Sequence, residues 1–329
     1  MGHSMTANTL RILYTGGTIG MLPSDNGLKP SANQLEQAVR QHFQAQWPEL
    51  KLLWHTREPL LDSSQAQPKD WLSLAEFVMT HCADNIPIVI LHGTDTLAYT
   101  SSVLSMMLPN LHPIVVLTGS QYPWQFEQSD GPSNLTLAAQ CALTATANTV
   151  YLAFHGKLFM GSHVTKYNAI GYDGFVAPHG VQQLQNPSRQ NDLRKIYPKR
   201  IEVVTCYPGT QYESLPAVLD THPDFLIIRA LGAGNIPNPS TLQSILNTKK
   251  VPLLINISQC LIANPTLSQY AINHVLLQFP WLDCQTMTFE ALFCKLHLLD
   301  PSITQPAEVN AFLTTPLDHE IPQAVSHLK

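Results

Sequence analysis

Two threonines stand beside glycines at the ends of apolar runs, where a hydroxyl can be presented for chemistry. Thr18 lies in TGGTIG after the run 10–14, and Thr94 lies in HGTDT after the run 86–91. Glycines permit a sharp backbone with positive φ that exposes a hydroxyl at the end of a strand. A hydroxyl attacks at neutral pH only when a neighbouring group takes its proton, so this interpretation requires a base.

Lys166, in VTKYN, is a candidate for this base because it is one of very few lysines in the expected first domain and its own segment carries little charge. A lysine removed from water gives up its proton more readily, and an acid such as Asp95 can hold it in place. The helix expected after Thr94 also begins with free N–H groups, which suit a carboxylate or a developing oxyanion.

Each of these residues also has an ordinary structural interpretation. TGGTIG can be a glycine-rich turn, Thr94 or Asp95 can be the N-cap of a helix, and Lys166 can be a solvated loop lysine. Spacing alone leaves these alternatives open.

The loops that would surround a site are rich in hydroxyls and amides. In an open parallel sheet, ligands bind outside the carboxyl ends of the strands, near the point where strand order reverses. That rule selects Thr15, Thr18, Ser63, Ser64, Gln65, Thr94, Asp95, Thr118, Ser120 and Gln121. A phosphate-binding loop has a different composition.

The elements that must position these loops follow from the pattern of apolar residues. Strands that are apolar on both faces are expected at 10–14, 86–91, 113–117 and 150–154, with another near 53–55, and helices near 31–43, 68–78, 96–108 and 135–145. The alternation of strand and helix predicts a right-handed α/β sheet of parallel type, flanked by helices.

The later part of the chain repeats this alternation on a smaller scale. Strands are expected at 201–206, 225–230 and 251–257, and helices at 214–219, 241–247, 268–277, 288–298 and 307–313. The segment 179–200 is polar and without periodicity, which is typical of a linker. We therefore predict an N-terminal α/β catalytic domain over 6–178, a linker over 179–200 and a smaller C-terminal α/β domain over 201–329.

Composition excludes several classes of partner. Charged residues make up 12% of the 329 residues, with 18 Lys and Arg against 23 Asp and Glu, a net charge of −5. No run of Lys or Arg is dense enough to neutralise a phosphate backbone, so we expect no nucleic-acid partner. No stretch reaches the roughly 18 apolar residues of a membrane span, and no signal pattern opens the chain. We expect a cytoplasmic protein with no membrane partner.

Motifs for cofactors and metals are also missing from the sequence. The glycines after the first run are spaced GGxxG instead of GxGxxG, and no acidic residue ends the strand near 53–55, which argues against a dinucleotide. The 14 histidines lack paired ligand spacing, so no metal site is expected. The six cysteines form no CxxC pair and are expected to be reduced, buried thiols.

Six motifs together resemble the bacterial L-asparaginase family. They are TGGTIGM at 15–21, LDSS at 61–64, HGTDT at 92–96, TGSQxP at 118–123, SDGPSN at 129–134 and VTK at 164–166, in the same order and at similar separations. YTGGTIGM, LHGTDTxAYT and the later KLHLL are similar to the cytoplasmic, type I branch in particular. The resemblance extends from the first strand to about residue 300.

This resemblance implies hydrolysis of the side-chain amide of L-asparagine to L-aspartate and ammonia, without a metal or organic cofactor. It assigns Thr18 as the nucleophile that forms an acyl-enzyme, and Thr94 with Lys166 and Asp95 as a proton relay. A weak activity on glutamine is expected as a side reaction.

The resemblance also implies how the substrate is held. Ser64, Gln65 and Asp95 would bind the α-carboxylate and α-ammonium groups, with Ser63 and Ser120 beside them. Members of the family are commonly homotetramers, built as dimers of dimers, in which a neighbouring subunit's second domain borders the site. On that model Asn235, in GAGN, would contribute to substrate binding.

One position departs from the family pattern. Related sequences carry a tyrosine in the loop after the first threonine, and the matching residue here is Leu28, which has no hydroxyl. Either another tyrosine such as Tyr14 takes that role, or turnover is weaker than in the family at large.

Leu28 therefore supports one rival, an asparaginase-like protein that binds an amino acid with little turnover. A nucleotide-dependent oxidoreductase is the rival suggested by the fold class, and the missing GxGxxG argues against it. The family's amidase subunit of transfer-RNA-dependent amidation carries an extra N-terminal module, for which a first strand near Leu10 would leave no room.

Overall fold

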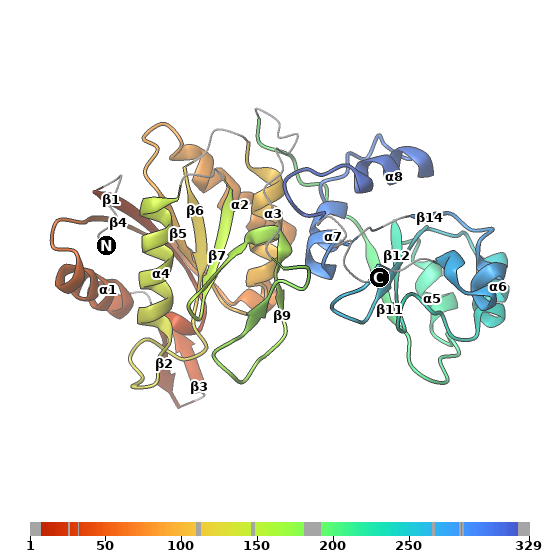
Figure 1. Ribbon diagram of the computed structural model, residues 1–329, viewed down its shortest axis with the longest axis horizontal. Coiled ribbons are helices and arrows are strands. Elements are labelled where there is room, and N and C mark those ends of the chain that lie inside the picture. Colours follow the sequence, from red (N-terminus) through yellow and green to blue (C-terminus); the bar gives the residue numbers. More distant parts are fainter. Residues whose placement is uncertain are drawn as a thin grey trace. The chain divides into compact units, whose positions relative to one another are not determined.

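The computed structural model of the chain describes residues 8–25, 27–31, 33–109, 113–145, 149–180, 192–264, 267–282, 284 and 286–321. It divides into two compact units (Figure 1), unit 1 with residues 1–195 and 317–320, and unit 2 with residues 196–316 and 321–329. The predicted class of two α/β domains is confirmed. The linker predicted over 179–200 lies half outside the described residues, which leave out 181–191, so its boundaries stay a prediction.

Unit 1 is built on a six-stranded sheet in the order β4-β1-β5-β6-β7-β8. The strands are β1 (Thr9–Gly16), β4 (Lys51–Leu61), β5 (Ile88–Leu91), β6 (Val115–Thr118), β7 (Val150–Phe154) and β8 (Lys157–Met160). The first five in this order run parallel, whereas β8 pairs antiparallel with β7. The sheet is therefore mixed, because the turn after Phe154 returns the chain directly to the edge of the sheet.

Helices cover both faces of this sheet. Helices α1 (Asn33–Gln46) and α4 (Gly131–Thr144) pack on one face against alternate residues of β1, and α4 lies in front of the strands in Figure 1. Helix α2 (Pro68–Thr80) packs on the other face, where Phe77 contacts His55 of β4. Helix α3 (Leu97–Met107) packs against α2, β6 and β7. Burial on both faces explains why these strands read as continuous apolar runs.

Strand order reverses at β1. The chain passes from β1 to β4 on one side and then crosses to β5 on the other side of β1. The loops that follow β1, β4 and β5 therefore leave the same edge of the sheet beside this switch point, which is where open α/β sheets bind ligands.

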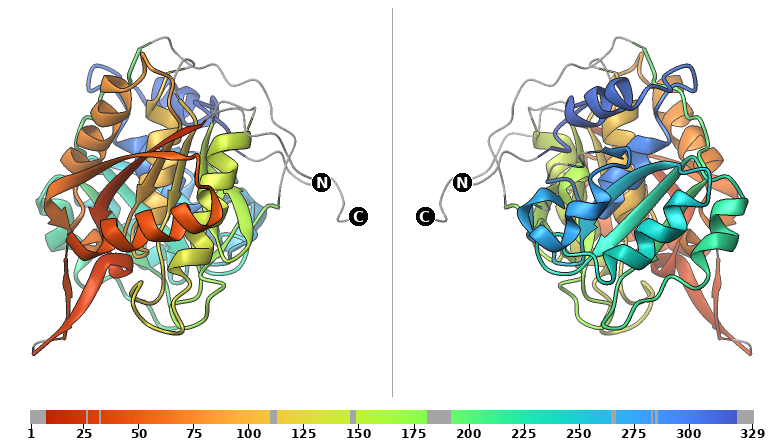
Figure 2. Two further views of the ribbon diagram at one scale, coloured as in Figure 1. Left: turned by 90° about the vertical axis from the view of Figure 1, so that its left-hand side faces the viewer. Right: turned by 90° about the vertical axis from the view of Figure 1, so that its right-hand side faces the viewer.

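Two smaller features accompany the main sheet of unit 1. A hairpin of β2 (Met21–Ser24) and β3 (Gly27–Pro30) projects from unit 1, as Figure 2 shows in red. The second feature is the 3-10 turn η3 (Gly161–His163) followed by β9 (Thr165–Lys166), which pairs antiparallel with β10 (Phe175–Val176). Neither the hairpin nor the β9–β10 pair follows from the apolar runs, because the hairpin is largely exposed and β9 and β10 have only two residues each.

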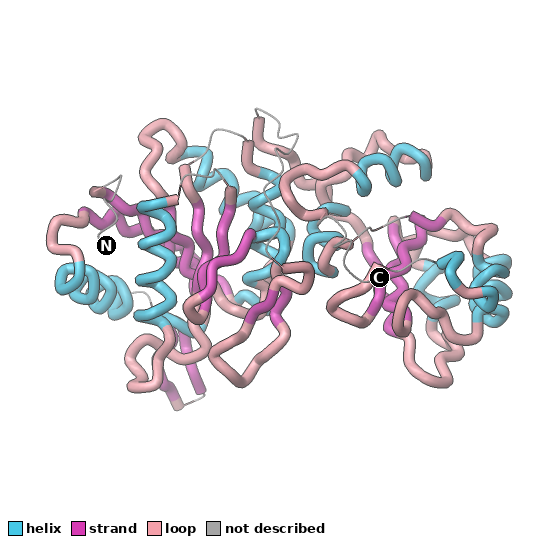
Figure 3. The backbone as a smooth tube through the Cα atoms, viewed as in Figure 1, coloured by secondary structure: helices cyan, strands magenta, loops and turns pink. Residues whose placement is uncertain are grey.

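Unit 2 has a four-stranded parallel sheet in the order β11-β12-β13-β14. Its strands are β11 (Ile201–Thr205), β12 (Phe225–Ala230), β13 (Leu253–Ser258) and β14 (Trp281–Leu282). Helices α5 (Leu215–Asp220) and α6 (Pro239–Asn247) pack in one hydrophobic cluster, and α7 (Phe289–Leu296) and α8 (Pro306–Thr314) in another. Figure 3 shows this alternation of strands and helices.

The helix expected at 268–277 is wrong. The chain instead forms the 3-10 turns η4 (Leu267–Gln269) and η5 (Ala271–Leu276). The side chain of buried Asn273 donates to the Leu267 and Gly234 carbonyls, and such side-chain bonds to the backbone compete with a regular helix. Over the described residues, no helix combines the length and apolarity that crossing a membrane requires.

An ion pair with a buried carboxylate joins α2 to β4. Asp70 accepts from Arg57 of β4 (Nη2 to Oδ1, 2.5 Å) and from the backbone N–H of Gln67 at the helix start (2.8 Å). Glu36 makes a comparable pair with Arg40 (2.8 Å), but on an exposed helix face.

Asp70→Ala should therefore lower the free energy of unfolding by about 3 kcal/mol, because it leaves a guanidinium without its partner and removes a capping bond. The matched variant Glu36→Ala should cost about 0.5 kcal/mol or less. Urea unfolding of both variants measures this, and equal losses would contradict the assignment of Asp70 as a structural anchor.

Candidate active site

Three loops meet at the switch point through backbone contacts that leave no room for side chains. A Cβ on Gly17, in the loop after β1, would lie 2.5 Å from the Cα of Gly93, in the loop after β5. A Cβ on Gly93 would lie 2.4 Å from the Oγ of Ser63, in the loop after β4. Gly17 also has a φ of 88°, which side chains rarely adopt. Glycine at these positions therefore brings the three loops together.

The two threonines of interest follow directly from the touching glycines. Thr18 opens the 3-10 turn η1 (Thr18–Gly20) after Gly17 and is partly exposed. Thr94 follows Gly93 and is buried. The structure thus brings the backbones that carry Thr18 and Thr94 to one place, although the two residues belong to different strand ends.

Lys166 reaches the same place from β9. Its Nζ donates to the Thr94 Oγ1 over 2.9 Å and to the Asp95 Oδ1 over 2.8 Å. The Lys166 side chain is 18% exposed, whereas that of Asp95 is 62% exposed. The ammonium is therefore withdrawn from solvent, while the carboxylate keeps a free face that another cation can approach. Lys166 is not a solvated loop lysine.

The N-cap interpretation of Thr94 and Asp95 does not hold. The N-cap of α3 is Thr96, and its side chain makes no capping hydrogen bond. The Thr96 Oγ1 instead donates to the Ser63 carbonyl over 2.8 Å. Thr94 and Asp95 precede the cap, so both side chains are available to Lys166.

His92 anchors the loop that carries Thr94. Its Nδ1 is 2.9 Å from the Gly93 carbonyl and its Nε2 is 3.2 Å from the Thr100 Oγ1 of α3. Complete burial lowers the pKa of His92 to about 4, so the imidazole is neutral at neutral pH. The Thr15 hydroxyl makes a second anchor by donating to the Leu91 carbonyl at the end of β5 (2.8 Å). Thr15 therefore has a structural part.

The predicted substrate residues of the loop after β4 form the 3-10 turn η2 (Ser63–Gln65). Ser63 is buried against Gly93, whereas Ser64 and Gln65 are exposed. The Gln65 Nε2 donates to the Ser64 Oγ over 3.2 Å, and the Ser64 N–H donates to Asp62 (2.9 Å). The two exposed side chains can meet a ligand from solvent, while Ser63 acts in loop packing.

The loop after β6 is held by a buried carboxylate that sequence reasoning did not single out. Asp130 accepts from the backbone N–H groups of Gln121 (2.9 Å) and Tyr122 (3.2 Å) and from the Asn134 side chain (2.9 Å). The Ser120 hydroxyl donates to the Tyr122 carbonyl (2.5 Å), so it too shapes this loop. The signal in the sequence was the SDGPSN motif itself, which contains both Asp130 and Asn134.

Gln121 links this loop to the segment that carries Lys166. Its Nε2 donates to the Gly171 carbonyl over 2.8 Å, between β9 and β10. The Thr118 hydroxyl donates to the Ala153 carbonyl (2.7 Å), which joins the ends of β6 and β7. Thr118 and Gln121 therefore have structural roles, because they join the loops and strand ends around the site.

Leu28 and Tyr14 do not supply the hydroxyl that the loop lacks. Leu28 lies on β3, paired with Pro23 across the hairpin, and is 46% exposed. The Tyr14 ring is fully buried, and its hydroxyl would lie 2.1 Å from a Cβ on Gly20, beneath η1. Burial raises the pKa of Tyr14 to about 12, which keeps its proton in place.

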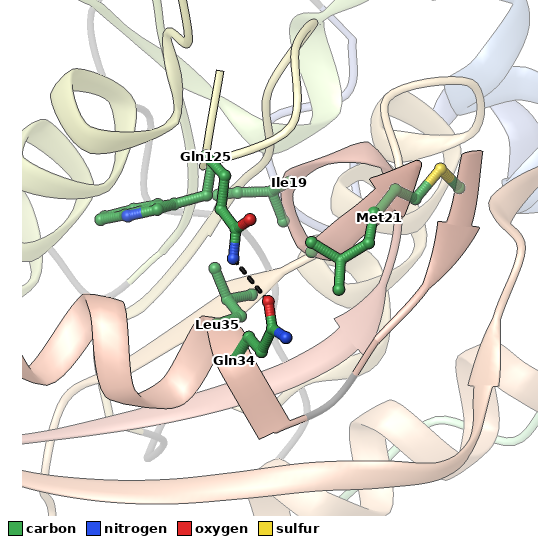
Figure 4. Close-up of a pocket in the computed structure, with 8 residues that line it drawn as sticks. Ile19, Met21, Gln34, Leu35 and Gln125 are labelled. Carbon is green, nitrogen blue, oxygen red and sulfur yellow. Dashed lines mark hydrogen bonds between the residues drawn. The ribbon is translucent and has the colours of Figure 1, made fainter. Parts of the chain in front are cut away.

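A small pocket lies beside η1, toward α1 (Figure 4). It is lined by Ile19, Met21, Leu35 and Trp124, and the Gln125 Nε2 donates to the Gln34 Oε1 across it (2.7 Å). The Trp124 N–H donates to the Ile19 carbonyl (3.0 Å). These contacts support the turn that presents Thr18.

The remaining expectations concern metals, cysteines and Asn235. Within the described ranges, no three His, Cys, Asp or Glu side chains gather to hold a metal ion. Of the six cysteines, four are buried as expected, whereas Cys82 is partly buried and Cys260 is exposed. Asn235 lies in unit 2 and closes a loop by pairing with Leu231 (N to O, 2.8 Å). Its part in substrate binding stays a prediction.

The contact between Gly17 and Gly93 can be tested with a matched pair of glycine-to-alanine variants. Gly17→Ala should lower the free energy of unfolding by about 2 kcal/mol or more beyond the loss for Gly27→Ala, which shares a positive φ but has open space around it. Thermal unfolding of both variants measures this. Equal losses would mean that the Gly17–Gly93 contact contributes nothing to stability.

Burial of His92 predicts a pH dependence of stability. Because its pKa in the folded state is about 4, against about 6.5 when unfolded, its contribution is fully present above pH 6.5 and is lost as the pH falls towards 4. The stability difference between the native chain and His92→Gln should therefore shrink by about 3 kcal/mol between pH 7.5 and pH 4. Unfolding curves at both pH values test this, and a constant difference would contradict it.

Comparison with known proteins finds two matching family models and several similar proteins. Residues 9–193 match the family model "Asparaginase, N-terminal", and residues 200–313 match "Glutaminase/Asparaginase C-terminal domain". L-asparaginase 1 of Escherichia coli (strain K12) is 35% identical over 312 residues, which cover 90% of this chain and 92% of that protein. L-asparaginase of Thermococcus kodakarensis is 31% identical over 307 residues, 87% of this chain and 91% of that protein.

A solved structure shows the same architecture. The crystal structure of L-asparaginase I from Vibrio cholerae has a TM-score of 0.80 and 31% sequence identity, covering 95% of this chain and 99% of that one. The loops described above coincide with the motifs that suggested the resemblance. Two family models that together span most of the residues, and relatives above 30% identity over nearly the whole length, show that this chain belongs to the asparaginase family.

Proposed function

We propose that this chain hydrolyses the side-chain amide of L-asparagine to L-aspartate and ammonia. The asparaginase class follows from the family and from similarity to the proteins named L-asparaginase in Escherichia coli and Thermococcus kodakarensis. The single observation that carries the mechanism is the Lys166 Nζ, which bridges Thr94 and Asp95 next to the glycine contact that carries Thr18.

In this proposal Thr18 is the nucleophile. Its Oγ attacks the amide carbon of the substrate, the C–N bond breaks, and an ester between Thr18 and the aspartyl group forms while the leaving nitrogen takes a proton as ammonia. Water then attacks the ester carbon, which releases aspartate and restores the Thr18 hydroxyl. No metal or organic cofactor enters either step.

Thr94, Lys166 and Asp95 would move the protons. In its neutral form the Lys166 amine accepts from the Thr94 hydroxyl, while one of its own N–H groups donates to Asp95. The Lys166 side chain is largely withdrawn from solvent, and the Asp95 carboxylate holds its Nζ at 2.8 Å.

The substrate would be held as a zwitterion. Asp95 keeps an exposed carboxylate face for the α-ammonium group, and Ser64 with Gln65 offers a hydroxyl and an amide for the α-carboxylate. Ser63, Ser120 and Asn235 are proposed as additional binding residues. L-glutamine, one methylene longer, would be a weak substrate because a pocket discriminates one methylene by only about 1–3 kcal/mol.

We also propose a cytoplasmic homotetramer, a dimer of dimers, for this chain. The proposal rests on the resemblance to the type I branch and on the match to both family models. Mass determination in solution tests the assembly.

A binding protein with little turnover is the second candidate. The observation in its favour is the missing loop hydroxyl, because Leu28 has none and the Tyr14 hydroxyl is buried beneath Gly20. Stabilisation by L-aspartate without release of ammonia from L-asparagine would support it.

Ammonia release distinguishes the two candidates. At millimolar L-asparagine we expect turnover by the native chain, a fall in kcat of about 100-fold or more for Thr18→Ala and for Thr94→Val, and no change for Thr144→Val. Thr144 is a suitable control because it lies at the far end of α4. An inactive native chain, or full activity of Thr18→Ala, would overturn the mechanism.

A further inference from the structure

Two carboxylates are buried in a segment that is neither helix nor strand. In Leu317–Glu320, Asp318 is 1% and Glu320 is 0% exposed, and these four residues pack with unit 1. Burying a carboxylate is costly unless other groups compensate its charge. The groups that Asp318 and Glu320 contact therefore indicate what the segment does.

Glu320 shapes the segment itself. Its Oε1 accepts from the backbone N–H of Leu317 and its Oε2 from that of Asp318, each over 2.8 Å, so the segment is closed into a tight turn. Burial lowers the pKa of the Arg194 guanidinium, and the charge of Glu320 opposes this effect. A partly buried cation therefore lies near the buried carboxylate of Glu320.

The other residues of the segment bind the turn η3. The Ser162 hydroxyl lies 3.4 Å from the Asp318 Oδ2, and the His163 Nε2 donates to the His319 carbonyl. Ser162 and His163 are themselves buried. The segment thus covers one side of η3.

Helix α3 holds η3 from its other side. The Gly161 carbonyl accepts from the hydroxyls of Ser101 (2.8 Å) and Ser102 (3.2 Å). A Cβ on Gly161 would lie 2.9 Å from the Ser101 carbonyl, so this approach is close. The turn η3 is therefore fixed between α3 and Leu317–Glu320.

The strand that follows η3 and the helix packed against it both adjoin residues of the proposed proton relay. The chain leaves η3 through buried Val164 into β9, which carries Lys166, and α3 begins directly after Thr94 and Asp95. A shift of η3 relative to α3 would change the distance from the Lys166 Nζ to the Thr94 Oγ1. The 317–320 segment restricts that shift without contacting either atom.

We propose that Leu317–Glu320 is a positioning segment for Lys166, acting through Ser162 and His163 of η3. The kinetic part of this inference rests on the proposed asparaginase function, whereas the structural part does not. Asp318 and Glu320 are positioning residues, because their described contacts do not include Lys166, Thr94 or Asp95.

The test compares Asp318→Asn and Glu320→Gln in the full chain, which keep side-chain size and remove the charge. The control is Leu143→Ala, which opens the core at the end of α4 opposite to the site. Hydrogen exchange is measured for peptides that cover 157–168, and kcat and KM are measured for release of ammonia from L-asparagine.

We expect both segment variants to exchange faster than the native chain at 161–166, and kcat to fall about tenfold while KM changes less than about twofold, because a small misplacement of a catalytic group lowers the rate. Leu143→Ala should lower thermal stability with kcat per folded enzyme unchanged. Unchanged exchange at 161–166 in both variants would overturn the inference whether or not the native chain is active. Faster exchange with unchanged kcat in an active enzyme would also overturn the positioning role.

Discussion

The backbones of Gly17 and Gly93 approach so closely that a Cβ on Gly17 would collide with Gly93, and a Cβ on Gly93 would collide with the Ser63 side chain. This contact joins the ends of the neighbouring strands β1 and β5, beside the point where strand order reverses. Everything proposed about the site depends on it, because Thr18 and Thr94 each follow one of these glycines. A larger residue at position 17 or 93 would separate the loops and the hydroxyls with them.

The site is supported by neutral side chains more than by ion pairs, as expected from a chain with 12% charged residues. Thr15, Thr96 and Thr118 donate to carbonyls of neighbouring loops or strands, and neutral His92 lies between the Thr94 loop and α3. Buried hydrogen bonds of this kind hold loops in place without adding charge near the reacting groups. Lys166 and Asp95 therefore carry charge in surroundings made mostly of neutral side chains.

Prediction from the sequence succeeded where the signal is local and failed where it depends on packing. The runs 10–14, 86–91 and 113–117 predicted β1, β5 and β6 because strands buried on both faces are apolar at every position. The helix expected at 268–277 was wrong because Asn273 directs its side chain to backbone groups of other loops. The part of Asp130 was missed, since a carboxylate in a loop sequence gives no sign that three N–H groups will surround it.

By itself, the sequence determined the family, the class of two α/β domains and the types of residue at each strand end, because motifs and apolar runs are contiguous along the chain. The tertiary structure alone decided that Lys166 meets Thr94, 72 residues away in the sequence, that Thr15 and Thr118 serve as structural links, and that Leu317–Glu320 covers η3. Contacts between distant segments depend on strand order, register and close backbone approach. These arise when the whole chain packs, and no local pattern encodes them.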